Sequence, residues 1–280
     1  MIDCVSRLPG RSVRRGCRVL GFRRQTYHSR KSGNRPEERD DELTELLRRT
    51  CSIFVAWGFW LVFHYLRNEY GLQDNHKRAY RLWKQAGLHL RTTPKRPKIR
   101  REYQELLAPS HVNEGWAMDF LSDWVIGPQK QSARIINVID ECSRRALWTT
   151  AHTSISAAKL ISVLDRLVAW RGAPAYIRWD NGPEFIANRL KAWADRHGID
   201  LRYIQPGKPS QNGIIERLNK TLRAECLDLH WFQSFTELNQ RIQDGSVVDN
   251  HVRPHSSIGY KPPLAYENAK EKFYFRAVAA

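Results

Sequence analysis

Apolar residues recur from residue 112 onward in a pattern that constrains the fold more than any other feature of this chain. Alternating or continuous apolar runs predict strands, and apolar stripes at helical spacing predict the helices between them. The strands are expected at 114–122, 134–139, 146–150, 175–179 and 199–204, and the helices at 156–170, 185–197 and 212–226. Three strands followed by alternating helices and strands predict an α/β fold, in which helices flank a mixed five-stranded sheet.

The first hundred residues lack this alternation and predict short helices instead. Residues 11–30 carry apolar side chains at helical spacing and then a basic stretch. This fits either a helix-turn-helix fragment or a basic helix packed on a partner. A charged amphipathic helix is expected at 37–50, with Leu43, Leu46 and Leu47 on one face.

Residues 52–90 predict a second helical pair that turns near Gly71. The run at 53–63 is strongly apolar but far shorter than the roughly 20 residues of a membrane span, so a buried helix is expected. The following helix, at 75–86, has a basic face suited to the DNA backbone or groove. The expected DNA-binding side chains on this face are Lys77, Arg78, Arg81 and Lys84.

Positive charge is concentrated in the front part of the chain. The whole sequence carries a net charge of +17. Residues 1–110 hold 24 basic against 11 acidic side chains, whereas 111–280 hold 22 against 18. The asymmetry indicates that one region grips nucleic acid while another carries the chemistry. The basic, proline-containing stretch 91–101 is expected to be an extended linker that follows phosphates.

These patterns divide the chain into four expected parts. They are a basic helical N-terminal segment (1–50), a helix-turn-helix-like region with its basic linker (51–101), a catalytic core (112–235), and a C-terminal helix with a Pro-containing tail (236–280). The five cysteines are scattered without a Cys-x-x-Cys pair, which argues against disulfides and a zinc site. With no signal-peptide pattern and no membrane span, a cytoplasmic location is expected.

Three carboxylates lie on separate expected elements that could meet at one edge of the sheet. Asp119 lies within the first strand, Asp180 ends the fourth, and Glu216 lies on the helix after the fifth. Without cations, neighbouring carboxylates repel one another. Mg²⁺ or Mn²⁺ takes oxygen ligands, and two such ions roughly 3.5–4 Å apart hold the attacking and leaving oxygens of a phosphoryl displacement. If the three carboxylates converge at one edge of the sheet, a pair of such cations is the arrangement that favours them.

The helix that carries Glu216 adds a second pattern. Counted from Glu216, the residues at −4, +3, +4 and +7 lie on the same face of the helix as Glu216. Their amide and cationic side chains suit contact with DNA phosphates. Taken alone, however, the helix fits an ordinary exposed surface with Glu–Lys pairs slightly better. The residues on that face are Asn212, Asn219, Lys220 and Arg223.

Local sequence around the carboxylates carries a family resemblance. The chain reads WAMDF at 116–120, WDNGPEF at 179–185 and PGKPSQNGIIER at 206–217, with 35 residues between Asp180 and Glu216. It resembles the DDE superfamily of retroviral integrases and insertion-sequence transposases, and in particular the second-frame (OrfB) product of a bacterial insertion-sequence family. Three further stretches extend the resemblance over nearly the whole chain, namely VRRGCRVLGFRRQTY at 13–27, NHKRAYRLWKQAGLHLR at 75–91 and RPHSSIGYKPPLAY at 253–266.

The resemblance implies a ribonuclease-H-like core preceded by a helical DNA-binding region. It implies that Asp119, Asp180 and Glu216 are catalytic ligands of Mg²⁺ or Mn²⁺, with Arg223 and the other polar residues of the Glu216 face contacting DNA. The implied activity is cleavage at element ends followed by strand transfer into target DNA. The implied partners are double-stranded DNA, the upstream-frame OrfA product or a fusion with it, and further copies of the chain, at the bacterial nucleoid.

Some residues fit other interpretations. The segment 52–65 is more apolar than the basic stretch that relatives tend to have, and the His/Cys zinc module of retroviral integrases is missing. Asp140 is expected to cap a strand end, and His255 to have a structural or DNA-backbone role. Two other functions stay open: an inactive or repurposed DNA-binding protein, and a ribonuclease-H-like nuclease that acts on RNA–DNA hybrids.

Overall fold

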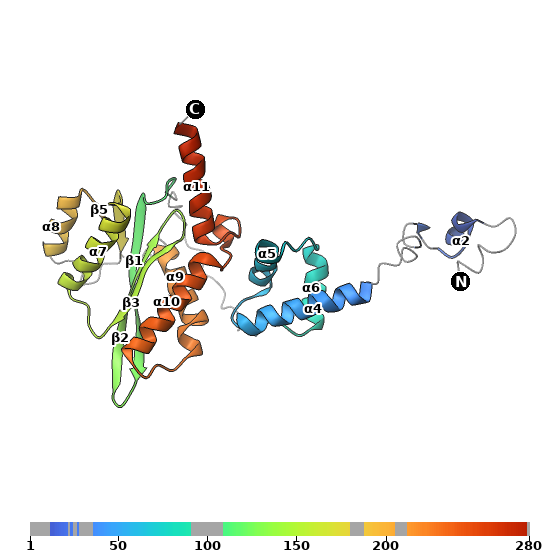
Figure 1. Cartoon of the computed structure of the whole chain (residues 1–280), viewed down its shortest axis with the longest axis horizontal. Helices are drawn as coiled ribbons and strands as arrows, with labels where there is room; N and C mark the ends of the chain where they lie inside the picture. The colour runs from blue at the N-terminus through green and yellow to red at the C-terminus, as the bar shows by residue number, and fades with distance from the viewer. Residues whose placement is uncertain are drawn as a thin grey trace.

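One mixed sheet of five strands organises the second half of the chain. The computed structural model describes residues 12–21, 23–24, 27, 36–90, 109–179, 188–204 and 212–278 (Figure 1). The sheet has the order β3-β2-β1-β4-β5. Its strands are β1 (Gly115–Ile126), β2 (Lys130–Asp140), β3 (Ala146–His152), β4 (Tyr176–Trp179) and β5 (Asp200–Tyr203). The expected mixed five-stranded sheet is confirmed.

The direction of each strand follows from the connection that leads to it. β1, β2 and β3 are joined by short turns and pair antiparallel. β4 follows α7 (Ala157–Arg171) and β5 follows α8 (Asn188–His197), and both pair parallel, as helical crossovers require. An antiparallel meander extended by two parallel strands is a ribonuclease-H-like arrangement, which confirms the expected fold class.

Helices cover both faces of the sheet (Figure 1). On one face, Trp116, Met118, Ile136 and Val138 pack with α7 and α8 in the main apolar core. The alternate residues of the same strands point to the other face, which packs against α9 (Gly213–Glu225) and α10 (Phe235–His251). The site described below lies on this second face.

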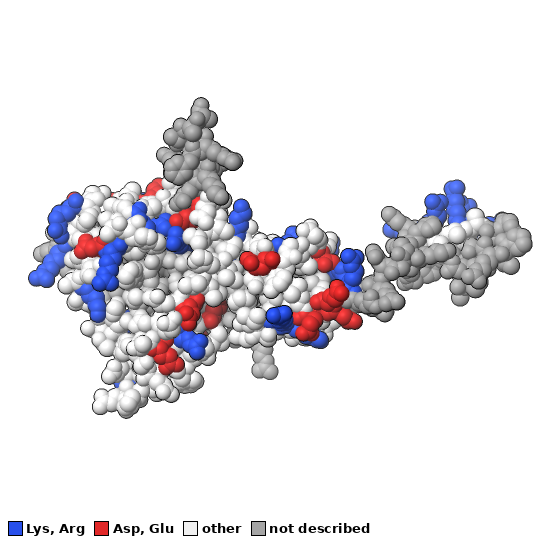
Figure 2. Space-filling view, viewed as in Figure 1, with Lys and Arg blue, Asp and Glu red and all other residues white. Residues whose placement is uncertain are grey.

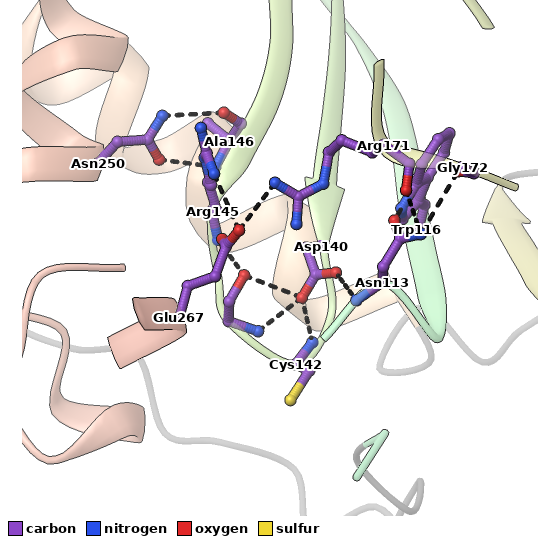
Figure 3. Close-up of polar contacts among 11 residues, drawn as sticks. Asn113, Trp116, Asp140, Cys142, Arg145, Ala146, Arg171, Gly172, Asn250 and Glu267 are labelled. Atoms are coloured by element: carbon purple, nitrogen blue, oxygen red, sulfur yellow. Dashed lines mark hydrogen bonds and ion pairs between the residues drawn. The ribbon is translucent and has the colours of Figure 1, made fainter. Parts of the chain in front are cut away.

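Two asparagines of α10 close the outer edge of the sheet. Asn250 Oδ1 accepts a hydrogen bond from the backbone N–H of Ala146, and Asn250 Nδ2 donates to the carbonyl of the same residue, both at 2.9 Å. Asn239 does the same at Ala151, at 2.8 and 3.0 Å (the Asn250 pair is drawn in Figure 3). An edge strand exposes unpaired backbone groups, so these side chains replace the missing neighbour of β3.

Gly245, in the middle of α10, offers a stabilising substitution. A Cβ added there would meet Cys226 Cβ at 3.5 Å, which is ordinary van der Waals contact. Gly245→Ala is therefore expected to raise the free energy of unfolding by about 0.5–1 kcal/mol, because alanine loses less conformational freedom in a helix. Chemical denaturation measures the change. Gly71→Ala is the matched control and is expected to destabilise the protein, because Gly71 has a φ of 64°.

Three helices before residue 90 form a separate packed unit, here called the helical unit. They are α4 (Pro36–Ile53), α5 (Phe59–Tyr70) and α6 (His76–Gln85). Leu43, Leu47, Val62, Phe63 and Trp83 are among its buried residues. The helix expected at 37–50 and the turn at Gly71 are both present, and the boundary expected between residues 50 and 51 falls inside α4.

The prediction of one buried helix over residues 53–63 is wrong. α4 ends at Ile53, a turn follows, and α5 starts at Phe59 with Gly58 as its N-cap. Trp57, Val62 and Phe63 are buried, but Ile53 and Val55 are half or more exposed. Apolar composition correctly indicated burial, but it did not show that Gly58 interrupts the helix.

The ends of the chain add further helices. α2 (Val13–Val19) is capped by Ser12, whose Oγ accepts a hydrogen bond from Arg15 N–H. The rest of the possible helix-turn-helix at 11–30 and the linker at 91–101 lie largely outside the described residues. After α9, short 3-10 helices at Leu227–Leu229 and Ser256–Ile258 flank α10, and α11 (Pro263–Val278) follows the Pro-containing segment. Across the described ranges, no helix is long and apolar enough to cross a membrane.

Candidate catalytic centre

Asp119 sits on β1 and faces α9. It shares a face of the sheet with Ala117, which packs against Ile215 and Leu218 of that helix. Its Oδ1 accepts a hydrogen bond from the N–H of Phe120 at 2.8 Å, and its Oδ2 accepts one from Asn219 Nδ2 at 2.7 Å. Both oxygens of this half-buried carboxylate are therefore held in a defined orientation.

A pair of buried asparagines supports that orientation. Asn137 lies directly opposite Asp119 on β2, and its Nδ2 donates to Asn219 Oδ1 at 2.6 Å. The donors run in one direction, from Asn137 through Asn219 to the carboxylate, so each amide polarises the next. Sequence reasoning missed Asn137, although an asparagine inside the apolar strand 134–139 was a signal that its side chain needed a buried partner.

Asn219 was expected to contact DNA, but its amide is used inside the protein. Its side chain is 8% exposed, and its two polar atoms bond to Asp119 and Asn137. Contact between Asn219 and DNA stays a prediction from the sequence. A role in holding Asp119 fits these contacts better.

Glu216 lies in the first turn of α9, three residues before Asn219. Residues three apart on a helix have Cβ atoms roughly 5–6 Å apart, so Glu216 lies one helical turn from the direct partner of Asp119. The Glu216 side chain is 39% exposed and lies 3.7 Å from Lys220 Nζ. The positive end of the helix dipole favours a carboxylate at this place.

Asp180, the third predicted ligand, lies outside the described residues. β4 ends at Trp179, the residue before it, and the parallel register places Arg178 opposite Ala117 of β1. In the part of the chain that the structure covers, no three His, Cys, Asp or Glu side chains are grouped closely enough to hold a metal ion. The described carboxylates, Asp119 and Glu216, offer the oxygen ligands that Mg²⁺ and Mn²⁺ prefer, so the donor set fits such ions.

The other predicted contacts on α9 differ in their surroundings. Asn212 precedes the helix as its N-cap residue and is 4% exposed, and its side chain makes no capping hydrogen bond. Lys220 is open to solvent. Arg223 Nη2 donates to the carbonyl of Ser122 at 2.7 Å, and its Nη1 lies 3.9 Å from Asp123 and 3.7 Å from Asp228. Arg223 is thus held against β1.

The basic face of α6 is partly neutralised by acidic neighbours. Arg78 Nε and Arg81 Nη2 donate to the two oxygens of Asp40 on α4, at 2.8 and 2.7 Å, and Arg78 also pairs with Asp74. Burial alone would raise the pKa of Asp40, but the hydrogen bonds from both arginines lower it overall. Lys77 and Lys84 are exposed. Figure 2 shows acidic and basic side chains interspersed over this unit.

Asp140 caps the end of β2, as the sequence predicted. Its Oδ1 accepts hydrogen bonds from Cys142 N–H, Ser143 N–H and Ser143 Oγ, and its Oδ2 accepts one from Asn113 N–H at 2.6 Å (Figure 3). Burial raises the pKa of Asp140, while these donors oppose the rise. Its acceptors are therefore used in shaping the turn.

Comparisons with known proteins place the chain in a family. Two family models, each described as an integrase core domain, match residues 109–209 and 197–263. An insertion element IS476 protein of Xanthomonas euvesicatoria is 34% identical over 91% of this chain and 72% of that protein. An insertion element IS407 protein of Burkholderia multivorans is 33% identical over 91% of this chain and 90% of that protein. The chain belongs to the insertion-sequence transposases of the DDE/integrase superfamily.

Solved structures resemble this transposase more distantly. One is the simian T-cell lymphotropic virus intasome in complex with PP2A regulatory subunit B56 gamma, at 17% identity, 73% coverage of each chain and a TM-score of 0.48. Another is the HTLV-2 integrase catalytic core domain in complex with magnesium, at 17% identity, 56% and 98% coverage and a TM-score of 0.43. Because both TM-scores are below 0.5, the ribonuclease-H-like assignment rests on strand order and on the family models.

Proposed function

We propose that this transposase cleaves DNA at the ends of its insertion sequence and transfers the freed 3′-hydroxyl ends into target DNA. Asp119, Asp180 and Glu216 act as the ligands of Mg²⁺ or Mn²⁺, with two ions in the site. The hydrogen bond between Asn219 and Asp119 carries the proposal, because it brings the helical turn of Glu216 to the face of the sheet where Asp119 lies.

Covalent connection supports the inclusion of Asp180. Asp180 is the next residue after Trp179, which ends β4. β4 pairs with β1 in parallel register, and neighbouring strands lie roughly 4.8 Å apart. The last pair of this register joins Ala117 to Arg178, and Asp119 and Asp180 each follow that pair by two positions in the sequence. This sequence relation is the ground on which we include Asp180 in the proposed site.

The ions, when bound, activate the attacking oxygen and stabilise the leaving oxygen of an in-line phosphoryl displacement. The residues of the chain provide orientation for that chemistry. Asn219 and the backbone N–H of Phe120 fix the two oxygens of Asp119. Lys220 places a cation beside Glu216, where it can pair with a DNA phosphate. Cleavage of a labelled end-sequence duplex with Mg²⁺ or Mn²⁺ tests the proposal, and the decisive variants are argued in the Discussion.

The lysines of α6 are proposed to grip the DNA backbone. Lys77→Ala and Lys84→Ala are each expected to reduce the salt dependence of DNA binding by about one phosphate contact, because each side chain is exposed. Arg78→Ala is expected to lower the thermal stability of the helical unit instead, because Arg78 bridges Asp40 and Asp74. Fluorescence anisotropy at several salt concentrations measures the slope. An unchanged slope in both lysine variants would remove α6 from the DNA-binding surface.

The two other functions considered from sequence gain no specific support. The apolar segment 52–65, which suggested an inactive protein, is accounted for by its packing in the helical unit. A comparison of duplex DNA with RNA–DNA hybrid as substrate separates transposase from hybrid-specific nuclease activity.

Partners are proposed on the same basis. We infer that this transposase binds element-end and target DNA, assembles with further copies of itself to hold two ends together, and works with an OrfA product or as a fusion with it. Light scattering after size-exclusion chromatography, with and without end DNA and OrfA, measures these assemblies. A cytoplasmic, nucleoid-associated location remains a prediction from the sequence.

A further inference from the structure

We propose that Glu225, at the C-terminal end of α9, is a positioning residue that fixes the helical unit to the catalytic core. Through Glu225, Trp57 and Arg253, the unit that carries the basic face of α6 is held at a set position relative to Glu216. The structural half of this inference stands on contacts alone. The functional half, that this contact aligns bound DNA with the catalytic centre, rests on the proposed function.

Glu225 is the meeting point of three segments far apart in sequence. Trp57, in the turn between α4 and α5, donates its Nε1–H to Glu225 Oε2 at 2.8 Å. Arg253, just after α10, donates from Nε to both oxygens of Glu225, at 2.9 and 3.0 Å. One carboxylate thus joins the helical unit, α9 and the segment after α10.

These charges lie in a largely buried environment. The side chains of Glu225 and Arg253 are 18% and 14% exposed. Asp249 Oδ1 lies 3.9 Å from Arg253 Nε and 3.3 Å from His255 Nε2, so both of these side chains adjoin the same buried group. Removing one partner from a buried ion pair leaves the other without compensation, so the contact depends on each of its members.

A second contact joins the helical unit to the segment after α10. His64 of α5 stacks on Tyr260, with ring centroids 3.6 Å apart and an angle of 12° between the planes. Asn68 Nδ2, one turn later, donates to the carbonyl of Tyr260 at 2.9 Å. The helical unit therefore contacts Glu225 at the end of α9 and Tyr260 in the segment after α10, and two separate contacts limit its rotation about either one.

The apolar part of this interface is incompletely filled. Val248 of α10 and its C-cap residue Val252 pack against the core of the helical unit. Beside them lies a cavity of about 400 Å³, lined by the turn at 53–57 on one side and by residues of α9 and α10 on the other. The pocket is partly open to solvent, so apolar packing covers only part of this interface, and the position of the helical unit also depends on its specific polar contacts.

The course of α9 links this interface to the chemistry. Glu216 lies in the first turn of the helix and Glu225 is its last residue. Nine residues at 1.5 Å each separate them by about 13–14 Å along a rigid axis. A shift of the helical unit against Glu225 changes the position of DNA held by that unit relative to Glu216. The contact therefore sets which phosphate of a bound end reaches the catalytic centre.

Trp57→Phe, Glu225→Gln and Arg253→Met test the inference in the full chain. Trp57→Phe removes the N–H donor and one ring of the indole but keeps an aromatic side chain. Trp60→Phe makes the same side-chain change at a half-exposed position of the same apolar stretch and serves as its control. Arg253→Lys keeps the charge and is expected to restore part of what Arg253→Met loses. Hydrogen exchange, DNA affinity, melting temperature and the position of cleavage on a labelled end duplex are measured for each variant.

Faster hydrogen exchange in residues 54–66 and 253–260 is expected in the Trp57, Glu225 and Arg253→Met variants, with β1 and β2 unchanged. Cleavage is expected to slow by about tenfold and to spread to neighbouring phosphates, while end-DNA affinity stays within about threefold of the wild type. Trp60→Phe is expected to match the wild type. A purely structural contact would lower the melting temperature without changing the cleavage position, and that result would overturn the functional half.

The two proposals fail in different ways. If the wild type binds end DNA but does not cleave it under any divalent-metal condition, the proposed function fails, and hydrogen exchange alone then decides whether the contact exists. If the wild type cleaves and Trp57→Phe, Glu225→Gln and Arg253→Met all cleave at the same phosphate with unchanged exchange, Glu225 has no positioning role. If one variant does not fold, the remaining two decide the outcome.

Discussion

Asp119→Asn is expected to reduce metal-dependent cleavage of end-sequence DNA by about a thousandfold or more. Asparagine keeps the size of the side chain and an oxygen that accepts from Asn219 Nδ2, so the support seen at 2.7 Å can persist. It removes the negative charge that a divalent cation requires. Glu216→Gln and Asp180→Asn are expected to show the same loss, because each removes one proposed ligand. A gel assay with a 5′-labelled duplex and Mg²⁺ or Mn²⁺ measures the rate.

The controls for these variants come from the same elements. Asp123 lies four residues after Asp119 on the same face of β1 and pairs with Arg223, so Asp123→Asn tests the loss of a nearby charge alone. It is expected to keep cleavage within a fewfold of the wild type. DNA binding is expected to be retained in all four variants. The melting temperature is expected to fall slightly only in Asp119→Asn, because the new NH₂ group faces the N–H of Phe120 when the oxygen accepts from Asn219. Substantial nicking by Asp119→Asn or Glu216→Gln would refute the assignment of the ligands.

Much of the secondary structure between residues 114 and 226 was predictable, because its strands and helices have strong apolar periodicity. Each strand and helix expected between 114 and 226 has a counterpart in the described structure. The ends were less certain: β1 continues to Ile126, four residues beyond the expected end, because Asp123 and Trp124 hide the alternation of its outer part. Hydrogen bonds to β2 in full register extend the strand there, and local sequence does not show them.

Side-chain partners at long separation were not predictable from sequence. Asn137 and Asn219 are 82 residues apart, and Trp57 and Glu225 are 168 apart. Helical spacing correctly grouped Asn219 with Glu216 on one face of α9, but it did not show whether that face meets β1 or solvent. The fold decides this question, because α9 lies against the face of the sheet that carries Asp119.

The basic face of α6 shows a related limit. Counting cations on one helix ignores acidic residues supplied by another, and Asp40 of α4 takes up both Arg78 and Arg81. The helix at 37–50 was expected to be charged and amphipathic, yet its sequence did not show which neighbour its acidic residues would meet. Charge patterning therefore predicted a DNA-binding surface without separating the paired arginines from the exposed lysines.

Asp140→Asn is expected to lower the free energy of unfolding by about 2–3 kcal/mol, because one acceptor oxygen is replaced by a donor amide. Oδ1 serves three donors and Oδ2 serves the N–H of Asn113, so the new NH₂ opposes a donor in either orientation. For a chain of this size the change corresponds to a fall in melting temperature of roughly 5–10 °C. Asp228→Asn is the control and is expected to change stability by less than about 0.5 kcal/mol, since Asp228 is 58% exposed.

Asp140→Asn is expected to change mainly stability, and Asp119→Asn mainly the cleavage rate. This contrast separates a structural carboxylate from a catalytic one. Both residues lie on neighbouring strands of the same sheet, and both are half or fully buried. The carboxylate oxygens of Asp140 accept hydrogen bonds from backbone and hydroxyl donors of the turn, so loss of the carboxylate is expected to reduce stability. The cleavage rate per folded molecule is expected to stay within about twofold of the wild type at low temperature. A large loss of cleavage at unchanged melting temperature would instead make Asp140 part of the catalytic centre.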